Sequence, residues 1–348
     1  MAKRPTQADV AKLAGVSRAT VSYVLNDRMD GRIPITDQTR ERVLDAARVL
    51  GYEPNALARN LKSGTSHMIG VLLPAVHNPH YWDILDGVAE VVSEQGYHLS
   101  LALSNLGLER ERLCLKSLLE QRYDGLILLP TFADVLEEEV KALSMRSSPA
   151  VFIGSPIGNA DWVFTDIRSG AQALMAHLIS LGHKRIGFIN GAARPQLSQT
   201  REDVYRESLL SAGLVLDEAL IHHCGYKMKN GYNAGLALLD LPEPPTAIWA
   251  INDLLAVSAA RAIHERGFCI PDDIALAGFD DIVFSRQLYP PLTTVHMPAA
   301  EMGRQAAEML IKRIDDPQHE PMHVFLDTQL IIRQSTVSTV SDIVSECG

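Results

Sequence analysis

Polar and aromatic side chains follow three short apolar runs of the chain, at 68–73, 247–250 and 274–278. They are His77, Asn78, His80, Tyr81 and Trp82 after the first run, Asn252 and Asp253 after the second, and Asp280 and Asp281 after the third. If the runs are parallel strands, their carboxyl ends meet at one edge of a sheet, where open α/β sheets bind ligands. These residue types therefore predict a binding site for a small polar molecule.

Catalytic and metal-binding patterns are weak in this sequence. It contains no GxSxG, GxxxxGK[ST] or HExxH motif. His77 and His80 could share one helical turn, but a pair of histidines without further ligands is usually not a metal site. His222, His223 and Cys224 are adjacent, so on a strand they alternate between faces and cannot converge on one ion. We predict no catalytic residue, no metal and no cofactor.

The N-terminal segment offers a different chemistry, which is recognition of double-stranded DNA. A helix over 18–25 would turn Val21, Val24 and Leu25 inward. The side chains that then face outward are Arg18, Ala19, Ser22, Tyr23 and Asn26. A guanidinium suits guanine, a small residue permits close approach to bases, and hydroxyls suit phosphates.

Two further helices would hold that recognition helix in place. One covers 7–14, begins at the Thr6 cap and ends at Gly15; the other covers 37–50, begins at the Thr36 cap and ends at Gly51. Ser17 can cap the middle helix. The expected core residues of the outer helices are Val10, Leu13 and Ala14 in the first and Val43, Leu44, Ala47 and Leu50 in the third. By itself this pattern also fits a small helical bundle that does not bind DNA.

Charge is divided unevenly along the 348 residues, whose net charge is -10. Residues 1–65 hold eleven Lys and Arg and seven Asp and Glu, a net of +4, so the remainder carries -14. A basic N-terminal segment on an acidic body favours a polyanion partner for that segment alone. No run is apolar enough for a membrane helix, no signal peptide is recognisable, and the four cysteines are widely spaced. We therefore expect a protein of the reducing cytoplasm with no membrane partner.

Residues 54–62 connect the two parts of the chain. Pro54 suits the first turn of a helix, and a Ser- and Gly-containing stretch follows Lys62. A helix of about eight residues is marginal in water because its nucleation cost exceeds its few hydrogen bonds. The segment is either a plain linker or a helix that needs a partner.

Beyond residue 67, short apolar runs alternate with helical stretches. Strands are expected at 68–73, 99–103, 125–129, 150–153, 186–189, 247–250 and 274–278, and helices at 81–94, 109–121, 169–181, 200–212, 252–266 and 299–314. Buried strands separated by helices predict parallel sheets with both faces covered. About 270 residues are enough for two such sheets.

The N-terminal block resembles the signature of the lactose-repressor/galactose-repressor (LacI/GalR) family of bacterial transcription regulators. The block is Asp9-Val10-Ala11, Ala14-Gly15-Val16-Ser17 and Thr20-Val21-Ser22-Tyr23-Val24-Leu25-Asn26. Further segments match the family in order, at 58–62, 163–166, 181–186 and 291–295, so the resemblance covers nearly the whole chain. It implies an α/β protein: an all-α helix-turn-helix head and a periplasmic-binding-protein-like body of two doubly wound parallel-sheet subdomains.

The resemblance also implies domain boundaries and DNA contacts. The head would be 1–52, the hinge helix and linker 53–65, the body 66–336 and the tail 337–348. Within the body, one subdomain would hold about 66–165 and 297–328, and the other about 166–296 and the chain end. The DNA-binding residues would be Thr6, Ser17, Arg18, Ala19, Thr20, Ser22, Tyr23, Asn26, Asn55, Ala58, Arg59, Leu61 and Lys62. Leu61 would be the apolar wedge that enters the minor groove and bends the duplex.

Carried over by position, the effector contacts would be His80, Tyr81, Asp166, Arg201, Tyr226, Asn252 and Asp280. Charged groups that bind hydroxyls, with aromatic faces for stacking, suit a sugar-like effector. Two places depart from the common family pattern. Ile167 stands where Asn is frequent, and Glu202 and Asp203 add carboxylates beside Arg201 that could narrow the pocket or favour a cationic ligand.

These observations predict a cytoplasmic, nucleoid-associated repressor that binds a palindromic operator as a homodimer and responds to a small effector. The alternative is a solute-binding protein with the same body and no DNA-binding role, against which the head, the hinge and the missing signal peptide argue. Val337, Val340 and Val344 have heptad-like spacing, but the run is too short for a lasting coiled coil. We therefore expect a dimer without a tail-mediated tetramer.

Overall fold

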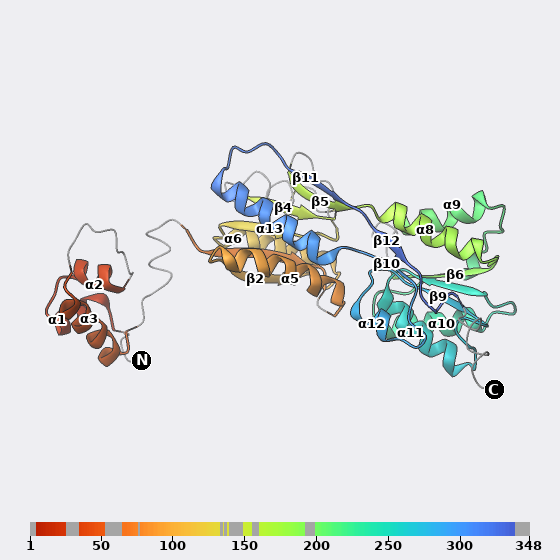
Figure 1. Cartoon of the computed structure of the whole chain (residues 1–348), viewed down its shortest axis with the longest axis horizontal. Coiled ribbons are helices and arrows are strands. Elements are labelled where there is room, and N and C mark those ends of the chain that lie inside the picture. The colour runs from red at the N-terminus through yellow and green to blue at the C-terminus, as the bar shows by residue number, and fades with distance from the viewer. Residues whose placement is uncertain are drawn as a thin grey trace, which may run out of the picture. The chain divides into compact units, whose positions relative to one another are not determined.

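The computed structural model describes residues 5–25, 35–52, 65–75, 77–132, 135, 138, 149–154, 160–191 and 199–337. The chain forms two units (Figure 1): Met1–Ser66, which holds the helices of the head, and His67–Gly348, which holds the body. The described part of the first unit is all-α, and the body is α/β with parallel sheets. The predicted fold class is confirmed.

The head consists of helices α1 (Gln7–Ala14), α2 (Arg18–Leu25) and α3 (Asp37–Leu50). Thr6 and Asp9 cap α1 reciprocally, with the Thr6 amide donating to the Asp9 carboxylate at 2.8 Å. Ser17 Oγ accepts the Thr20 amide at 3.1 Å at the start of α2. Gly15 (φ 66°) ends α1 in the left-handed conformation that favours glycine. The predicted helix bounds of the head are therefore confirmed.

The core of the head is built from small and β-branched residues. Its buried members are Val10, Ala11, Ala14, Val21, Val24, Val43, Ala46 and Ala47. The prediction was wrong for two leucines, because Leu13 is 53% exposed and Leu44 is 42% exposed. Successive helix residues are rotated by about 100°, so Ala11 and Ala46 face the core in their places.

The first half of the body is a six-stranded parallel sheet. Its strands are β1 (Met68–Leu73), β2 (His98–Leu103), β3 (Gly125–Leu128), β4 (Ala150–Ile153), β5 (Asp161–Thr165) and β11 (His323–Leu326), in the order β11-β5-β4-β3-β1-β2. Its helices are α5 (Pro79–Glu94), α6 (Leu108–Glu120) and α13 (Ala299–Asp315). α5 and α13 pack closely at Gly87 and Gly303, where a β-carbon would overlap a backbone oxygen of the facing helix.

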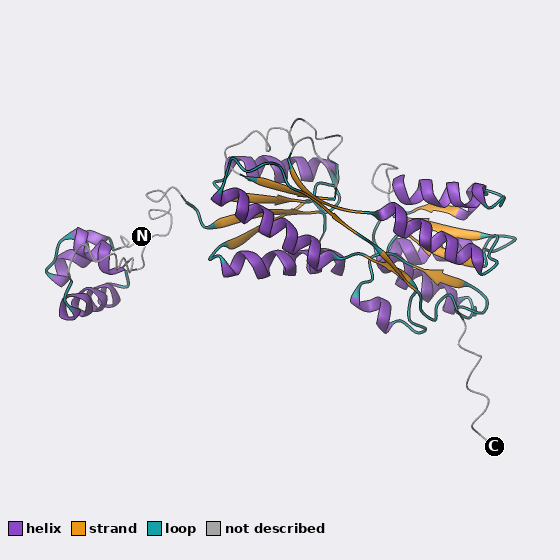
Figure 2. Cartoon of the chain, turned by 45° about the horizontal axis from the view of Figure 1, so that its top comes forward, coloured by secondary structure: helices purple, strands orange, loops and turns teal. Residues whose placement is uncertain are grey.

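The second half is a four-stranded parallel sheet with helices on both faces (Figure 2). Its strands are β6 (Ile186–Asn190), β7 (Ile221–His223), β8 (Ala247–Ala250) and β9 (Ala275–Ala277), in the order β7-β6-β8-β9. Its helices are α8 (Ile167–Ser180), α9 (Gln199–Ser211), α10 (Met228–Leu239), α11 (Asp253–Glu265), α12 (Val283–Gln287) and the short 3-10 helix η2 (Glu218–Leu220).

The chain passes between the two halves three times. The passages lie between β5 and α8, between β10 (Thr294–His296) and α13, and between β11 and β12 (Gln329–Ile331). β10 and β12 pair antiparallel, with Val295 opposite Leu330, and Figure 2 shows this strand pair next to the junction. Neither half is therefore a continuous segment of sequence.

Every strand and helix predicted for the body is present, with small shifts of the ends. The prediction omitted β5, β7, β10, β11, β12, α10 and α12. β7, β10 and β12 have only three residues each, and β11 is a half-exposed strand at the sheet edge. β5 starts at the charged residue Asp161, whose buried carboxylate pairs with Arg313 at 2.8 Å and accepts the Met322 amide at 2.7 Å. Among the described residues, no helix combines the length and apolar character needed to cross a membrane.

Candidate functional site

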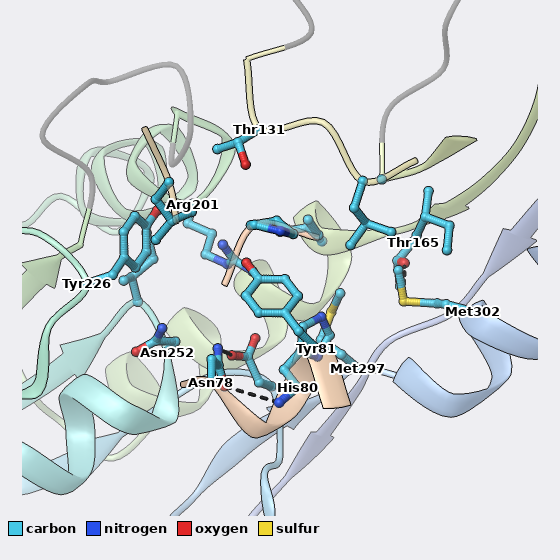
Figure 3. Close-up of a pocket in the computed structure, with 18 of the residues that line it drawn as sticks. Asn78, His80, Tyr81, Thr131, Thr165, Arg201, Tyr226, Asn252, Met297 and Met302 are labelled. Atoms are coloured by element: carbon cyan, nitrogen blue, oxygen red, sulfur yellow. Dashed lines mark hydrogen bonds between the residues drawn. The ribbon is translucent and has the colours of Figure 1, made fainter. Parts of the chain in front are cut away.

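A cavity of about 260 Å³ lies between the two halves of the body (Figure 3). The first half and the passages contribute Pro74, Asn78, His80, Tyr81, Leu106, Leu129, Pro130, Thr131, Ile153, Gly154, Thr165, Met297 and Met302. The second half contributes Ile167, Arg201, Tyr226, Ile251, Asn252 and Asp280. The wall combines apolar and polar side chains, and its polar groups converge from both halves.

Six of the seven predicted effector residues line this cavity: His80, Tyr81, Arg201, Tyr226, Asn252 and Asp280. Each follows a parallel strand, on the first turn of a helix or in the connection before it. The seventh, Asp166, does not line the cavity. It caps α8, accepting the Ser169 amide at 3.1 Å and the Ser169 hydroxyl at 2.5 Å, whereas its neighbours Thr165 and Ile167 do line the cavity.

Three buried polar atoms of the lining have no hydrogen-bond partner among the described residues: His80 Nδ1, Thr131 Oγ1 and Arg201 Nε. Buried polar groups are nearly always hydrogen-bonded in folded proteins, so unpaired atoms around one cavity point to a bound polar molecule. The Arg201 guanidinium lies 4.3 Å from the centre of the Phe279 ring, and this contact supports its flat face.

The titratable groups of the cavity nearly cancel in charge. Burial lowers the pKa of His80, although Asp280 opposes this effect, so the imidazole is neutral. Burial raises the pKa of Tyr226 to about 12 and that of Tyr81 further, so both phenols keep their protons. The positive Arg201 and the negative Asp280 remain. A balanced cavity of this kind favours an uncharged ligand with hydroxyl groups.

Asp280 and Asp281 both have positive φ values, 108° and 57°, which are unusual for residues other than glycine. The Asp281 carboxylate holds this turn by accepting from Arg333 at 2.6 Å, His296 at 3.2 Å and Arg286 at 3.3 Å. Two of these partners belong to the strand pair at the junction of the halves: His296 is the last residue of β10, and Arg333 follows β12. Backbone strain held in place by surrounding contacts is common at ligand sites.

The two carboxylates beside Arg201 do not line the cavity. Glu202 is buried and accepts from Asn190 at 2.8 Å, from His223 at 2.9 Å and from Arg206 at 2.9 Å. Asp203 accepts from Gln199 at 2.6 Å. They neither narrow the pocket nor add negative charge to its wall, whereas Ile167 does form part of the apolar wall. Within the described ranges, no three His, Cys, Asp or Glu residues are grouped as metal ligands.

Sequence reasoning named Asn78 as a strand-end residue but left it out of the expected effector contacts, and it missed other lining residues, including Thr131, Met297 and Met302. Thr131 and Asn78 both follow predicted strands, and residues at the carboxyl ends of parallel strands are the ones expected to bind ligands. Met297 directly follows β10, a strand too short to be recognised in the sequence, and Met302 lies on the first turn of α13.

The predicted DNA-binding residues of the head that the structure describes lie on or directly before α2, except Thr6, which precedes α1. Thr6, Ser17, Arg18 and Ala19 are exposed, and Thr20, Ser22 and Tyr23 are half-buried. Thr6 and Ser17 also cap helices α1 and α2. The other predicted contacts, Asn26, Asn55, Ala58, Arg59, Leu61 and Lys62, lie outside the described residues.

Comparison with known proteins identifies the family. Residues 6–55 match the bacterial regulatory proteins of the lacI family, and residues 175–336 match the periplasmic binding protein-like domain. The chain is 33% identical over 335 residues to the HTH-type transcriptional repressor PurR of Haemophilus influenzae, which covers 95% of this chain and 98% of the relative. This chain belongs to the lacI family.

Further lacI-family proteins match over nearly the full length. The HTH-type transcriptional regulator CelR of Thermobifida fusca is 34% identical over 342 residues, covering 96% of this chain and 98% of the relative. A solved structure of a CelR–cellobiose complex has a TM-score of 0.68 at 31% identity, covering 95% of this chain and 100% of that chain. The lac repressor dimer bound to operator and the anti-inducer ONPF has a TM-score of 0.81 at 26% identity, covering 96% and 99%.

These relatives are transcriptional regulators and not enzymes. This lacI-family protein is accordingly a DNA-binding regulator with a ligand-binding body. A solute-binding protein without a DNA-binding role is not favoured, because the lacI match covers the head itself.

Proposed function

We propose that this regulator is a homodimeric repressor released from, or held on, its operator by an uncharged, sugar-like effector bound in the cavity. The observation that carries the proposal is the set of buried, unpaired atoms His80 Nδ1, Thr131 Oγ1 and Arg201 Nε around one cavity. A polyol supplies both donors and acceptors and adds no charge to the balanced pair of Arg201 and Asp280.

Two solved relatives support a sugar as the effector class. One is the complex of CelR with cellobiose, and another is a LacI-family regulator from Enterococcus faecium with bound ribose, which is 27% identical and has a TM-score of 0.67. The ring faces of a sugar fit Tyr81 and Tyr226, while its hydroxyls fit Asp280, Asn252 and Arg201. Asp166, which caps α8, remains a predicted contact that needs a ligand-induced change to take part.

The head and hinge are proposed to bind DNA in two ways. Thr6, Ser17, Arg18, Ala19, Thr20, Ser22, Tyr23 and Asn26 would contact bases and phosphates in the major groove. Asn55, Ala58, Arg59 and Lys62 would lie at the minor groove, with Leu61 as the wedge. A palindromic operator requires a two-fold dimer, and the body is the part large enough to hold it. Such a regulator works in the cytoplasm, at the nucleoid.

The proposed domain organisation assigns 1–52 to the head, 53–65 to the hinge, 66–336 to the body and 337–348 to the tail. Effector binding can alter DNA affinity only by binding one arrangement of the two halves more tightly than another. A change in that arrangement would alter the separation of the two hinge segments in the dimer, and thereby the cost of pairing them on DNA.

The test begins with thermal shifts of the full chain in cellobiose, D-ribose and other sugars, nucleosides and amino acids. Arg201→Ala and Asp280→Asn should each weaken binding of any stabilising sugar by about ten- to a hundredfold, the cost of one charge-assisted hydrogen bond. Arg261→Ala, on the exposed face of α11, is the matched control. Binding of the variants to an operator selected from genomic fragments should be unchanged without effector. If both variants bind the sugar as tightly as the parent protein, the effector site lies elsewhere.

A further inference from the structure

A buried carboxylate lies next to Arg201 in the sequence, but it faces the sheet and not the cavity. Glu202 is 7% exposed. One oxygen, Oε2, accepts from Asn190 Nδ2 at 2.8 Å and is 2.9 Å from His223 Nε2. The other, Oε1, accepts from Arg206 Nε at 3.0 Å and from an Arg206 terminal nitrogen at 2.9 Å. Both oxygens are therefore fully used inside the protein.

The partners of Glu202 come from three different elements. Asn190 is the last residue of β6, His223 is the last residue of β7, and Arg206 lies one turn further along α9. Arg206 also reaches Glu218 of η2, at 2.5 Å and 2.9 Å. The first turn of α9 is thereby fixed to the carboxyl edge of the sheet, which is the edge that the cavity uses.

Arg201 lacks a comparable anchor. Its Nε has no hydrogen-bond partner among the described residues, and its guanidinium rests on the Phe279 ring. Successive side chains on a helix point about 100° apart, so the direction of Arg201 follows from that of Glu202. Fixing Glu202 against the sheet turns Arg201 toward the cavity.

We propose that Glu202 is a positioning residue for effector binding: its bonds to Asn190, His223 and Arg206 fix the start of α9 and aim Arg201 into the cavity. The inference rests on the proposed function only where it concerns the effector. The placement of Arg201 by Glu202 is testable in the ligand-free protein.

The first experiment compares Glu202→Gln with Glu207→Gln in the ligand-free full chain. Glu202→Gln replaces one carboxylate oxygen with an amide nitrogen. This nitrogen would face either Asn190 or Arg206, and both of these side chains donate hydrogen bonds. Glu207→Gln alters a carboxylate of the same helix that is exposed and paired with Arg168 at 2.8 Å. Amide exchange of a peptide spanning 199–206 and the rate at which phenylglyoxal modifies Arg201 are measured by mass spectrometry.

Glu202→Gln should speed both exchange and Arg201 modification by about tenfold, as expected for the loss of charge-assisted hydrogen bonds, and Glu207→Gln should leave both unchanged. If Glu202→Gln does not fold, two less disruptive variants of His223 test the proposal instead. His223→Leu removes one donor and should speed both rates, while His223→Gln retains an amide donor and should match the parent protein. Parent-like rates at Arg201 in both Glu202→Gln and His223→Leu would overturn the proposal.

The second experiment separates positioning from general stabilisation. Calorimetry with cellobiose and with D-ribose compares Glu202→Gln, Arg201→Ala and the double variant. Glu202→Gln should weaken sugar binding about tenfold in the parent background and have no further effect in the Arg201→Ala background. An equal further loss in that background would show that Glu202 acts on the body as a whole and would overturn the proposal. If neither sugar binds the parent protein, the sugar class fails while the Arg201 modification rates still decide the role of Glu202.

Discussion

The side chain of Asn78 donates a hydrogen bond from Nδ2 to Oδ2 of Asp280 at 3.1 Å, across the junction of the two halves of the body. Asn78 also caps α5, since its Oδ1 accepts the His80 amide at 3.1 Å. One side chain thus holds the helix that carries His80 and Tyr81 and contacts the carboxylate expected to bind the effector. Both residues are buried and line the cavity.

Asn78→Asp should weaken effector binding about tenfold, because a second carboxylate would face Asp280 at hydrogen-bond distance. The change keeps an acceptor for the His80 amide, so α5 remains capped. Asn78→Ser also keeps a cap but adds no charge, and it is the matched control. Small-angle scattering of the ligand-free variants should show a larger radius of gyration for Asn78→Asp alone. Identical radii and affinities for Asn78→Asp and Asn78→Ser would mean that charge repulsion at this position does not affect the arrangement of the two halves.

Arg18→Ala should cost about 1–3 kcal/mol of operator affinity and relax specificity at one base position, because a guanidinium that contacts guanine is lost. Arg48→Ala is the control: Arg48 lies on α3 of the same head, is exposed and pairs with Asp45 at 3.0 Å. Fluorescence anisotropy against a set of single-base operator variants gives both quantities. Unchanged affinity and specificity would place the base contacts on other residues of α2.

Asp253 should make the body less stable as the pH rises. Its carboxylate is buried and accepts from Ser285 Oγ at 2.5 Å, Thr294 Oγ1 at 2.6 Å and the Ile282 amide at 3.0 Å. Burial, followed by repulsion from Asp280, raises its pKa to about 8. The folded protein therefore keeps a proton that the unfolded chain releases near pH 4, and this stabilisation is lost as the pH rises toward 8.

Relative to Asp253→Asn, the free energy of unfolding of the parent protein should fall by up to about 1.4 kcal/mol per pH unit between about pH 5 and 7. Asp240→Asn, an exposed carboxylate paired with Arg266, should run parallel to the parent. Denaturant titrations at several pH values measure the slopes. A pH dependence that Asp253→Asn leaves unaltered would mean that Asp253 is ionised in the folded protein.

Leu61→Ala should weaken specific DNA binding more than nonspecific binding, because removal of the wedge removes much of the bend. Ala58→Gly should raise the ordering cost of the hinge by up to about 1 kcal/mol per subunit. Amide exchange of residues 56–61 should slow on operator binding and respond to effector. Protection that is equal with and without operator would contradict a hinge that orders on DNA.

The sequence predicted most of the body because its long buried strands are continuous apolar runs, as at Met68–Leu73 and Ala247–Ala250. It failed where three residues form a strand only through tertiary pairing, as β10 does with β12. The same limit applies to the site. Strand-end positions such as Asn252 and Asp280 can be predicted from local sequence patterns. The orientation of the Asp166 side chain and the presence of Met297 in the cavity wall depend on tertiary contacts between distant segments.

Glu202 is a residue whose orientation could not be predicted from the sequence. Its position beside Arg201 suggested a charged wall of the cavity, and a sequence alone cannot say to which side a helix turns each of two adjacent residues. That choice depends on Asn190 and His223, which are twelve or more positions away. The amphipathic pattern of α9 gives little guidance, because Glu202 is itself one of the buried residues of the helix.

The place of β11 in the first sheet has a consequence for how the protein is made. β11 (His323–Leu326) pairs with β5, and α13 packs against α5, although both come after the whole four-stranded sheet of the second half in the chain. During translation, all parallel strands of the second half leave the ribosome first. Only then do α13 and β11, which complete the first half, emerge. The first sheet stays open along β5 until translation is nearly complete. Ribosome-bound intermediates thus expose an unpaired strand edge, which gives chaperones a place to act, and fragments truncated before residue 323 should aggregate.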